Sequence, residues 1–525
     1  MSRFGRAIDR TVAAFSPERA LRRELARRKL EILNTGYSHH GASQIKKSLI
    51  GWVSTGGDAD ADIVDNLPKL RERSRDLVMG MPIATGAMKT IRTNVVGAGL
   101  RLNASIDFEF LGLSSDEANA WEVNTEREFR VWADSKNCDA ARMMTFGQIQ
   151  GLALISALAS GDVFAALPLI PRAGSVYDLR ISLIEADRVS DPSPKPAGKN
   201  IFGGVEINDL GEAVACYIER THPGAKIKSS KREWDRVEFF GAETGRPNIL
   251  HITQDWERPG QRRGAPLLAP VIETLKQLSR YSDAELMAAV VAGMFTVFIR
   301  SQTPEAPIGQ AIPADQQIDA ADPSSIELGP GAIVGLGDGE DIVVANPSRQ
   351  NSAFDGFVTA ICRQIGVALE IPYELLVKHF TASYSASRAA LLEAWKMFRM
   401  RRTWMVQSFC QPIYEEWLAE AVLKGRIQAP GFFDDPVVRA AWCGAKWYGP
   451  SQGHLNPQQE AAAAKIRIEE EISTREREAA EYAGESWESI HAVRVREEGA
   501  RRRDATATDR AVAATGLEDG AGGED

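Results

Sequence analysis

The sequence of 525 residues is poor in cysteine and holds none of the spacings that build disulfide or metal frameworks. Its five cysteines are widely separated, and no two of them form a CxxC pair. This usage is typical of proteins that stay in a reducing compartment, not of small secreted domains. We therefore expect five reduced thiols, at Cys138, Cys216, Cys362, Cys410 and Cys443.

Long hydrophobic runs are also missing. The longest run, Leu286–Ile299, spans 14 residues, whereas a helix needs about 20 residues to cross a bilayer. The N-terminal residues lack the apolar core of a signal peptide. We interpret Leu286–Ile299 as a buried helix, and we expect no membrane partner.

Catalytic signatures are absent as well. The sequence has no HExxH, no GxSxG and no Walker A motif, and its histidines are scattered. Gly329, Gly331 and Gly335 do not have the spacing of a phosphate-binding loop, so we interpret them as turns between short strands. The Asp-rich stretch 51–62 lacks the spacing and the terminal Glu of a calcium loop. The sequence therefore predicts no catalytic residues, no cofactor and no metal site, and a protein that is not an enzyme.

Acidic residues outnumber basic ones, 71 to 62, which gives a formal net charge of −9. A protein that coats DNA is normally basic, so the composition argues against that class. It leaves open a protein that DNA slides past, because an acidic wall repels phosphates and prevents sticking.

The first part of the chain changes from a basic arm to a globular pattern. Residues 1–65 are interpreted as a basic arm followed by a loop rich in Gly and Asp. From residue 66 the spacing predicts two helices and a strand, with Pro82 in the first turn of the second helix.

Helices and then strands follow this opening. A helix is expected over 125–133, with Phe129 and Trp132 facing inward, and another over 145–160. Between 162 and 252 the hydrophobic period changes to two, which indicates a β-rich subdomain.

The second half is dominated by helical patterns. We expect helices over 265–299 and 354–370, separated by a Pro-, Gly- and Asp-rich stretch, and a long helical pattern over 383–423. In this last stretch, residues at helical spacing share one face, and Arg402 interrupts their stripe. The apolar members are Leu391, Trp395, Phe398, Met405 and Phe409.

The boundaries of the long pattern also follow from its residues. Ser385 or Ser387 is expected to cap its start, because a short hydroxyl accepts a bond from an unpaired helix amide. Pro412 is expected to kink or break the helix near residue 411. Gly425 is a suitable stop.

Several strings resemble a known family. They are SYSASRAALLEAW (383–395), PIYEEWL (412–418), NVVGAGL (94–100), the stretch from ERPG to KQL (257–278) and WYGP (447–450). In order and spacing these segments resemble the portal proteins of tailed phages, in the family typified by the lambda portal. The first string departs from the Asn-Tyr-Ser-Ser form common in that family, with Ser383 in place of Asn and Ala386 in place of the second Ser.

The resemblance implies an α+β portal fold with a β-containing wing, long stem helices, a small α/β clip and a helical crown. The segments in chain order are a basic N-terminal arm and loop (1–65), wing (66–264), first stem helix (265–300), clip (301–350), second stem helix (351–372), tunnel loop (373–388), long helix and wing/crown connection (389–455), helical crown (456–503) and, from composition, a disordered tail (504–525).

The resemblance also implies a function. The chain would form a ring of twelve subunits at one capsid vertex of the virion, assembled in the host cytoplasm. Double-stranded DNA would be packaged and ejected through the channel without sequence specificity. The ring would act as a head–tail connector, with the terminase, the major capsid protein and a head–tail adaptor as partners.

The residues that would face DNA are placed by the same resemblance in the tunnel loop. A cation, hydroxyls and an aromatic ring can contact backbone phosphates without reading bases. The candidates are Lys378, His379, Thr381, Ser383, Tyr384 and Arg388. Two alternatives remain open from the residues alone: an α+β enzyme of unknown reaction, and a scaffold or adaptor module without DNA passage.

Overall fold

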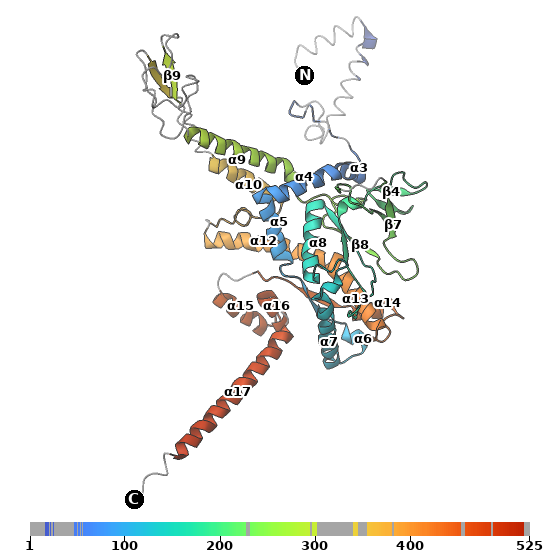
Figure 1. The fold of residues 1–525 in the computed structure, drawn as a ribbon, viewed down its shortest axis with the longest axis vertical. Coiled ribbons are helices and arrows are strands. Elements are labelled where there is room, and N and C mark those ends of the chain that lie inside the picture. Colours follow the sequence, from blue (N-terminus) through green and yellow to red (C-terminus); the bar gives the residue numbers. More distant parts are fainter. Residues whose placement is uncertain are drawn as a thin grey trace, which may run out of the picture. The chain divides into compact units, whose positions relative to one another are not determined.

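The computed structural model describes residues 56–226, 231–293, 297–301, 340–344, 354–380, 383–452, 457–484 and 487–518, with scattered positions before residue 55 (Figure 1). The chain divides into two compact units, residues 1–58 and 59–525. The elements below belong to the second unit. Most of the predicted basic arm therefore lies outside the described residues.

The second unit opens with helices. They are α3 (Ala59–Ile63), the 3-10 turn η2 (Val64–Asn66), α4 (Leu67–Gly80) and α5 (Pro82–Val95), followed by strand β1 (Arg101–Ala104). Pro82 stands at the start of α5, where its missing N–H has no helical partner to lose. The prediction of two helices and a strand is confirmed.

The next helices carry the aromatic core. They are α6 (Phe108–Leu111), α7 (Ser115–Ala133), the turn η3 (Lys136–Cys138) and α8 (Phe146–Ser160). Ser114 and Glu117 form a capping box at the start of α7, so each satisfies an otherwise unpaired backbone N–H. Gly161 ends α8 at a φ of +92°, a conformation that favours glycine. Phe129 and Trp132 are buried, as predicted.

Two antiparallel sheets form the β-rich subdomain. One has the order β3-β2-β8, and the other β4-β5-β6-β7. Their strands are β2 (Asp162–Ala166), β3 (Ser182–Ile184), β4 (Asn200–Phe202), β5 (Val205–Ile207), β6 (Ala213–Glu219), β7 (Trp234–Glu238) and β8 (Ile249–Thr253), with the turn η4 (Ala186–Arg188) between β3 and β4. A small second core that includes Phe164, Val205 and Cys216 packs in this subdomain. The predicted change to strands is confirmed.

After the turn η5 (Ala269–Val271), two helices lie side by side: α9 (Ile272–Gly293) and α10 (Phe354–Ala368) (Figure 1). Tyr281 of α9 packs against Phe354 and Phe357 of α10. Between them, β9 (Val297–Ser301) pairs antiparallel with β10 (Glu340–Val344).

The predicted helix over 265–299 is therefore too long. The interpretation of Leu286–Ile299 as a buried helix is also wrong, because Leu286, Met287 and Val290 of α9 are exposed in the single chain. Residues Val297–Ser301 form a strand, because their β-branched and aromatic side chains favour a paired ribbon, and β10 supplies the partner. Gly329, Gly331 and Gly335, predicted to lie in turns, fall outside the described residues.

The long helical pattern is one nearly continuous run. It comprises α12 (Tyr384–Met405), a π-helical turn (Val406–Cys410) and α13 (Gln411–Leu423), and it follows the short helix α11 (Tyr373–Leu376). Trp395, Phe398, Met405 and Phe409 are buried on one side, as predicted. Leu391 is half-buried.

The predicted kink or break near residue 411 takes the form of a π-helical turn, Val406–Cys410, and the helical run continues beyond it. Pro412 stands at the start of α13, and the π-turn before it absorbs the missing hydrogen bond. One predicted boundary of this run needs correction. The cap is Ser383, whose Oγ accepts from the N–H of Ala386 at 3.4 Å, and not Ser385 or Ser387. Gly425, at a φ of +67°, ends α13 as predicted.

The C-terminal part first contributes buried residues to the core, such as Trp442 and Trp447, and then continues as helices with few buried residues. Helix α14 (Pro436–Trp442) precedes strand β11 (Ala445–Tyr448), which pairs with β1. Three helices follow: α15 (Pro457–Glu469), α16 (Arg475–Ala483) and α17 (Trp487–Glu518). Residues 504–518, expected to belong to a disordered tail, are helical as the end of α17.

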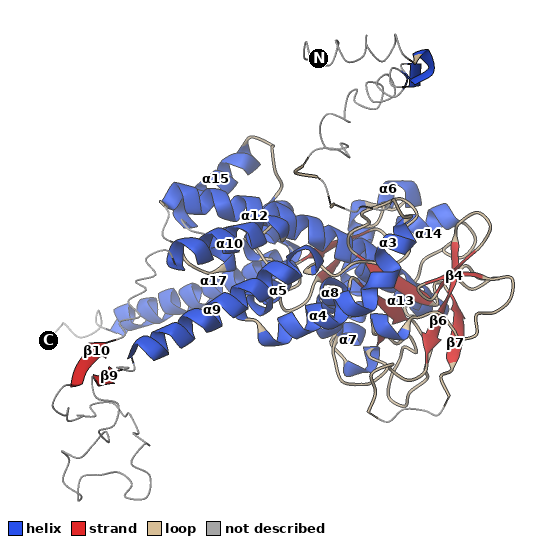
Figure 2. Cartoon of the chain, turned by 90° about the horizontal axis from the view of Figure 1, so that it is seen from above, coloured by secondary structure: helices blue, strands red, loops and turns tan. Residues whose placement is uncertain are grey.

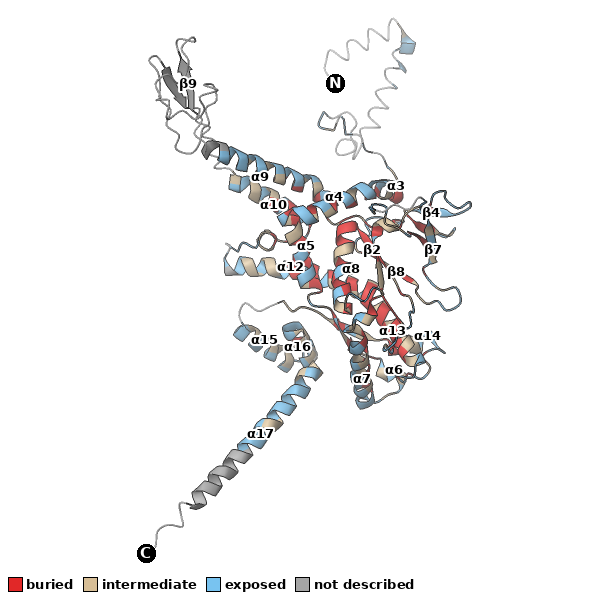
Figure 3. Ribbon diagram, in the orientation of Figure 1, coloured by how far each residue is buried: buried red, intermediate tan, exposed pale blue. Residues whose placement is uncertain are grey.

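The buried residues concentrate around α8, β2, β8 and α13, whereas α17 is largely exposed over the residues whose burial is described (Figure 3). Helices and short sheets share the unit (Figure 2), so the α+β class is confirmed. All five cysteines are free and buried, in agreement with the prediction of reduced thiols. No helix among the described residues combines the length and apolarity that a bilayer span requires.

Candidate nucleic-acid interface

A tight turn between α10 and α11 sets the start of the predicted tunnel loop. Glu370 has a φ of +57°, and the N–H of Ile371 donates to the carbonyl of Gly366 at 2.9 Å. A Cβ on Gly366 would lie 2.5 Å from the carbonyl oxygen of Ile371, so this position requires glycine. Leu376 is buried and anchors α11. Packing on both sides of the turn therefore fixes where the next residues begin.

Three of the predicted site residues lie exposed along this connection. Lys378 has a φ of +55°, and the N–H of His379 donates to the carbonyl of Glu374 at 3.0 Å. Both side chains are exposed, as is Ser383, which caps α12. A cation, an imidazole and a hydroxyl are thus available at the surface, as contact with backbone phosphates needs.

The other three predicted residues do not join this group in the structure. Thr381 lies outside the described residues, and Tyr384 begins α12 without a described side chain. Arg388 is half-buried and lines a groove of about 580 Å³ between α12 and the helices α15 and α16, whose lining also includes Glu460 and Glu478. Arg388 is therefore directed to a different environment from Lys378 and His379.

Arg402, which interrupts the apolar stripe of α12, acts as an anchor. Its Nε and Nη2 donate to the carbonyls of Val95 and Asn94 at 3.1 and 2.9 Å, and Nη2 also donates to Pro450 at 2.7 Å. A cation at the C-terminal end of α5 also interacts favourably with the helix dipole. Burial, and then the charge of Arg399, lower the pKa of Arg402 to about 10.

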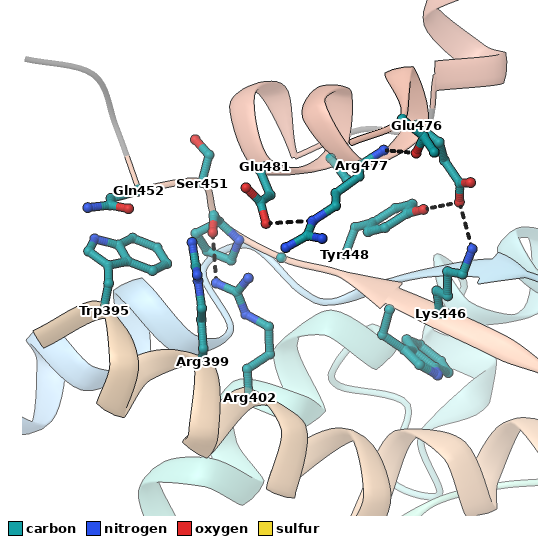
Figure 4. Close-up of a pocket in the computed structure, with 15 residues that line it drawn as sticks. Trp395, Arg399, Arg402, Lys446, Tyr448, Ser451, Gln452, Glu476, Arg477 and Glu481 are labelled. Carbon is teal, nitrogen blue, oxygen red and sulfur yellow. Dashed lines mark hydrogen bonds and ion pairs between the residues drawn. The ribbon is translucent and has the colours of Figure 1, made fainter. Parts of the chain in front are cut away.

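Above Arg402 lies a cavity of about 460 Å³ between α12, β11 and α16 (Figure 4). Arg399 and Arg402 rise side by side from α12, and Arg477 reaches in from α16. On the β11 side, Glu476 accepts from Tyr448 at 2.7 Å and from Lys446 at 3.1 Å. The sequence analysis did not predict this pocket. The one sequence signal related to it is Arg402, a cation that interrupts the apolar stripe of α12.

A second buried charge cluster ties α4 to the β-rich subdomain. The fully buried Asp162 carboxylate accepts from Arg71 at 2.9 Å and from Arg263 at 2.6 and 3.1 Å, and lies 3.1 Å from Nε2 of His251. Burial alone would raise the pKa of Asp162, but Arg263 and Arg71 outweigh it and hold that pKa well below its usual value. Burial also lowers the pKa of Arg71, to about 10, and that of His251. This cluster joins residues that are far apart in the sequence.

Within the described residues, one set of side chains converges as metal ligands could. Oxygens of Glu185 and Asp187 lie near Nε2 of His222. Arg75 Nη1 lies 3.1 Å from Glu185 and also bonds Asp187. Because a guanidinium already balances both carboxylates, we assign no metal to this group.

Comparison with known proteins agrees with the resemblance seen in the sequence. A family model described as "Phage portal protein, lambda family" matches residues 46–402. Portal protein B of Escherichia phage lambda is 26% identical over 491 residues, which cover 89% of this chain and 90% of that protein. The portal protein of Escherichia phage N15 matches with the same identity and coverage.

Solved structures show more distant similarity. The neck of an empty gene transfer agent particle aligns with a TM-score of 0.42 and 14% identity, over 71% of this chain and 93% of that chain. An HK97 family portal protein from Corynebacterium diphtheriae aligns with a TM-score of 0.30 and 12% identity, over 66% of this chain and 88% of that chain.

Proposed function

The chain belongs to the lambda family of phage portal proteins, and from this premise we propose that it forms a ring at one capsid vertex through which double-stranded DNA is packaged and ejected. Portal proteins are structural components of the virion, so the expectation that the chain is not an enzyme is confirmed by its family. The match over residues 46–402 is the observation that carries the proposal.

The segments of a portal subunit can be assigned along the chain. The stem comprises 265–300 and 351–372, which hold the neighbouring helices α9 and α10. The clip (301–350) lies between them and includes β10, with β9 at its border. The wing comprises residues 66–264. The long helix with the wing/crown connection comprises 389–455, and the crown comprises 456–503.

Exposed apolar side chains on α9 support assembly. Leu286 and Met287 are 67% and 63% exposed in the single chain. Contiguous exposed apolar residues often mark an interface, and a neighbouring copy in a ring would cover them. A cyclic contact of this type closes on itself without a self-complementary patch. We propose twelve subunits in the ring.

The tunnel loop (373–388) is the proposed contact with passing DNA. Lys378 and His379 are exposed on the described part of this loop, and they can touch phosphates without reading bases. The proposed partners of the ring are the terminase during packaging, the major capsid protein around the wing, and a head–tail adaptor at the clip.

Packaging can be tested with particles assembled in cells from the phage's own structural proteins. Particles made without this chain are expected to protect no DNA from nuclease, and the full chain supplied from a plasmid is expected to restore protection. Full-length protected DNA in the absence of the chain would overturn the proposal.

A charge-reversal pair tests the tunnel loop separately. Lys378→Glu with His379→Glu is expected to leave particles assembled and to lower the mass of protected DNA per particle, because like charges repel passing phosphates. The control Lys69→Glu reverses an exposed charge on α4 and is expected to package normally. Equal packaging by both variants would remove the loop assignment while leaving the ring proposal intact.

A further inference from the structure

The cavity above Arg402 is lined by this half-buried cation, which has no carboxylate partner among the described residues. The side chain of Arg402 donates to three backbone carbonyls through Nε and Nη2, and Nη1 makes no hydrogen bond to another described residue. Neutral carbonyls satisfy N–H groups, but they offset a buried positive charge less than an anion does. The guanidinium of Arg402 also lies 5.7 Å from the centre of the Trp395 ring. Because Trp395 is buried and its ring faces Arg402, it forms part of the cavity lining and does not offer a free face for stacking with a ligand.

Two further arginines face the same space. Arg399 is exposed, its guanidinium has no hydrogen-bond or ion-pair partner among the described residues, and its charge lowers the pKa of Arg402. Arg477 approaches from α16, with Glu481 at 3.4 Å as its ion-pair partner (Figure 4). Lys446 and Glu476 pair with each other at 3.1 Å. The lining therefore carries an excess of positive charge inside a concave site.

From this arrangement we propose that the cavity binds a phosphate group, held between Arg399 and Arg402 on one side and Arg477 on the other. A phosphate offers several oxygens to guanidinium groups that converge from two helices, and such pairs are strong because both partners are charged. The anion would relieve the repulsion between Arg399 and Arg402. The same chemistry is offered by a DNA backbone and by free phosphate. The inference does not depend on ring formation, because all three arginines belong to one chain.

The test measures binding to the purified full chain by isothermal titration calorimetry at constant ionic strength. Inorganic phosphate, a short DNA duplex and a single-stranded oligonucleotide serve as separate probes, with chloride as the competing anion. Arg399→Ala is expected to weaken binding of the phosphate probe by about tenfold or more, the loss typical of one charge-assisted hydrogen bond. Arg477→Ala is a second variant with the same expectation.

The matched control is Lys396→Ala, which removes an exposed positive charge from the same helix. Lys396 pairs with Glu393 at 2.6 Å and does not line this cavity. The control is expected to bind phosphate as the wild type does. Binding of the duplex or oligonucleotide that depends on Arg399 identifies a DNA phosphate, and binding of inorganic phosphate alone identifies a free phosphate site. Equal weakening by Arg399→Ala and Lys396→Ala, or no binding above the chloride background, would overturn the proposal.

Discussion

Asp162 shows at the scale of single residues how this chain holds distant segments together. Its carboxylate accepts hydrogen bonds from Arg71 of α4 and from Arg263 in the segment before α9. Both arginines also donate to the carbonyl of Ala186. A buried charge is tolerated when it is paired and fully hydrogen-bonded. Removing this anion would leave Arg263 without a carboxylate partner among the described residues, and Arg71 with only Asp187, 3.9 Å away.

Asp162→Asn is therefore expected to destabilise the protein by about 3–5 kcal/mol, the range for breaking one partner of a buried ion pair. The measurement is the free energy of unfolding from urea titration at pH 7. Because the pKa of Asp162 is lowered in the folded state, its contribution is present above the unfolded value of about 3.9 and is lost as pH falls through the folded pKa. The deficit of the variant is thus expected to shrink at acid pH.

Asp235→Asn provides the control for this prediction. Asp235 pairs with Arg220 at 2.8 Å, but both side chains are more than half exposed. Exposed ion pairs contribute only about 0–1 kcal/mol, so this variant is expected to unfold close to the wild type. A loss at Asp162 no larger than that at Asp235 would contradict the role of the cluster.

At the scale of elements, the turn after α10 positions the start of the proposed tunnel loop. Gly366→Ala is expected to lower the free energy of unfolding of the protein by about 1–3 kcal/mol, because the new Cβ would clash with the carbonyl oxygen of Ile371. Faster hydrogen exchange of the amides at 371–377, together with a lower thermal midpoint, would report the loss.

The same helix holds a matched control. Gly356 has nothing within 4 Å of an added Cβ, so Gly356→Ala is expected to gain roughly 0.5–1 kcal/mol from helix propensity alone. Stabilisation by both substitutions would show that the contact with Ile371 does not restrict position 366.

Most elements could be predicted because their hydrophobic period is clear. The helical spacing of Trp395, Phe398 and Met405 predicts α12, and the change of the hydrophobic pattern to a period of two residues predicts the sheets. The sequence predicts a helix as far as residue 299 because a short apolar run is ambiguous, and strand β9 forms only with β10, some forty residues later. The cap at Ser383 was missed because several hydroxyl residues stand in a row.

The functional groups were harder to predict than the elements. Lys378 and His379 are predicted in an exposed connection because the resemblance to the portal family assigns a tunnel loop there, and both side chains are exposed. The phosphate pocket joins Arg399 to Arg477, about eighty positions apart, and the Asp162 cluster joins Arg71 to Arg263. No local pattern encodes such pairings, because they exist only after the helices and sheets have packed.

At the scale of the whole molecule, the acidic balance agrees with the proposed channel. A net charge of −9 would weaken a protein that coats DNA, but it suits a passage that DNA must leave as easily as it enters. Local cations such as Lys378 and Arg399 can then guide phosphates without holding the genome.

Electron microscopy of the purified full chain tests the ring most directly. Class averages are expected to show rings with an open axial channel, because a neighbouring copy would cover the exposed apolar residues of α9. The proposed assembly predicts twelve-fold symmetry. Particles that remain small and compact at every protein concentration would contradict the account.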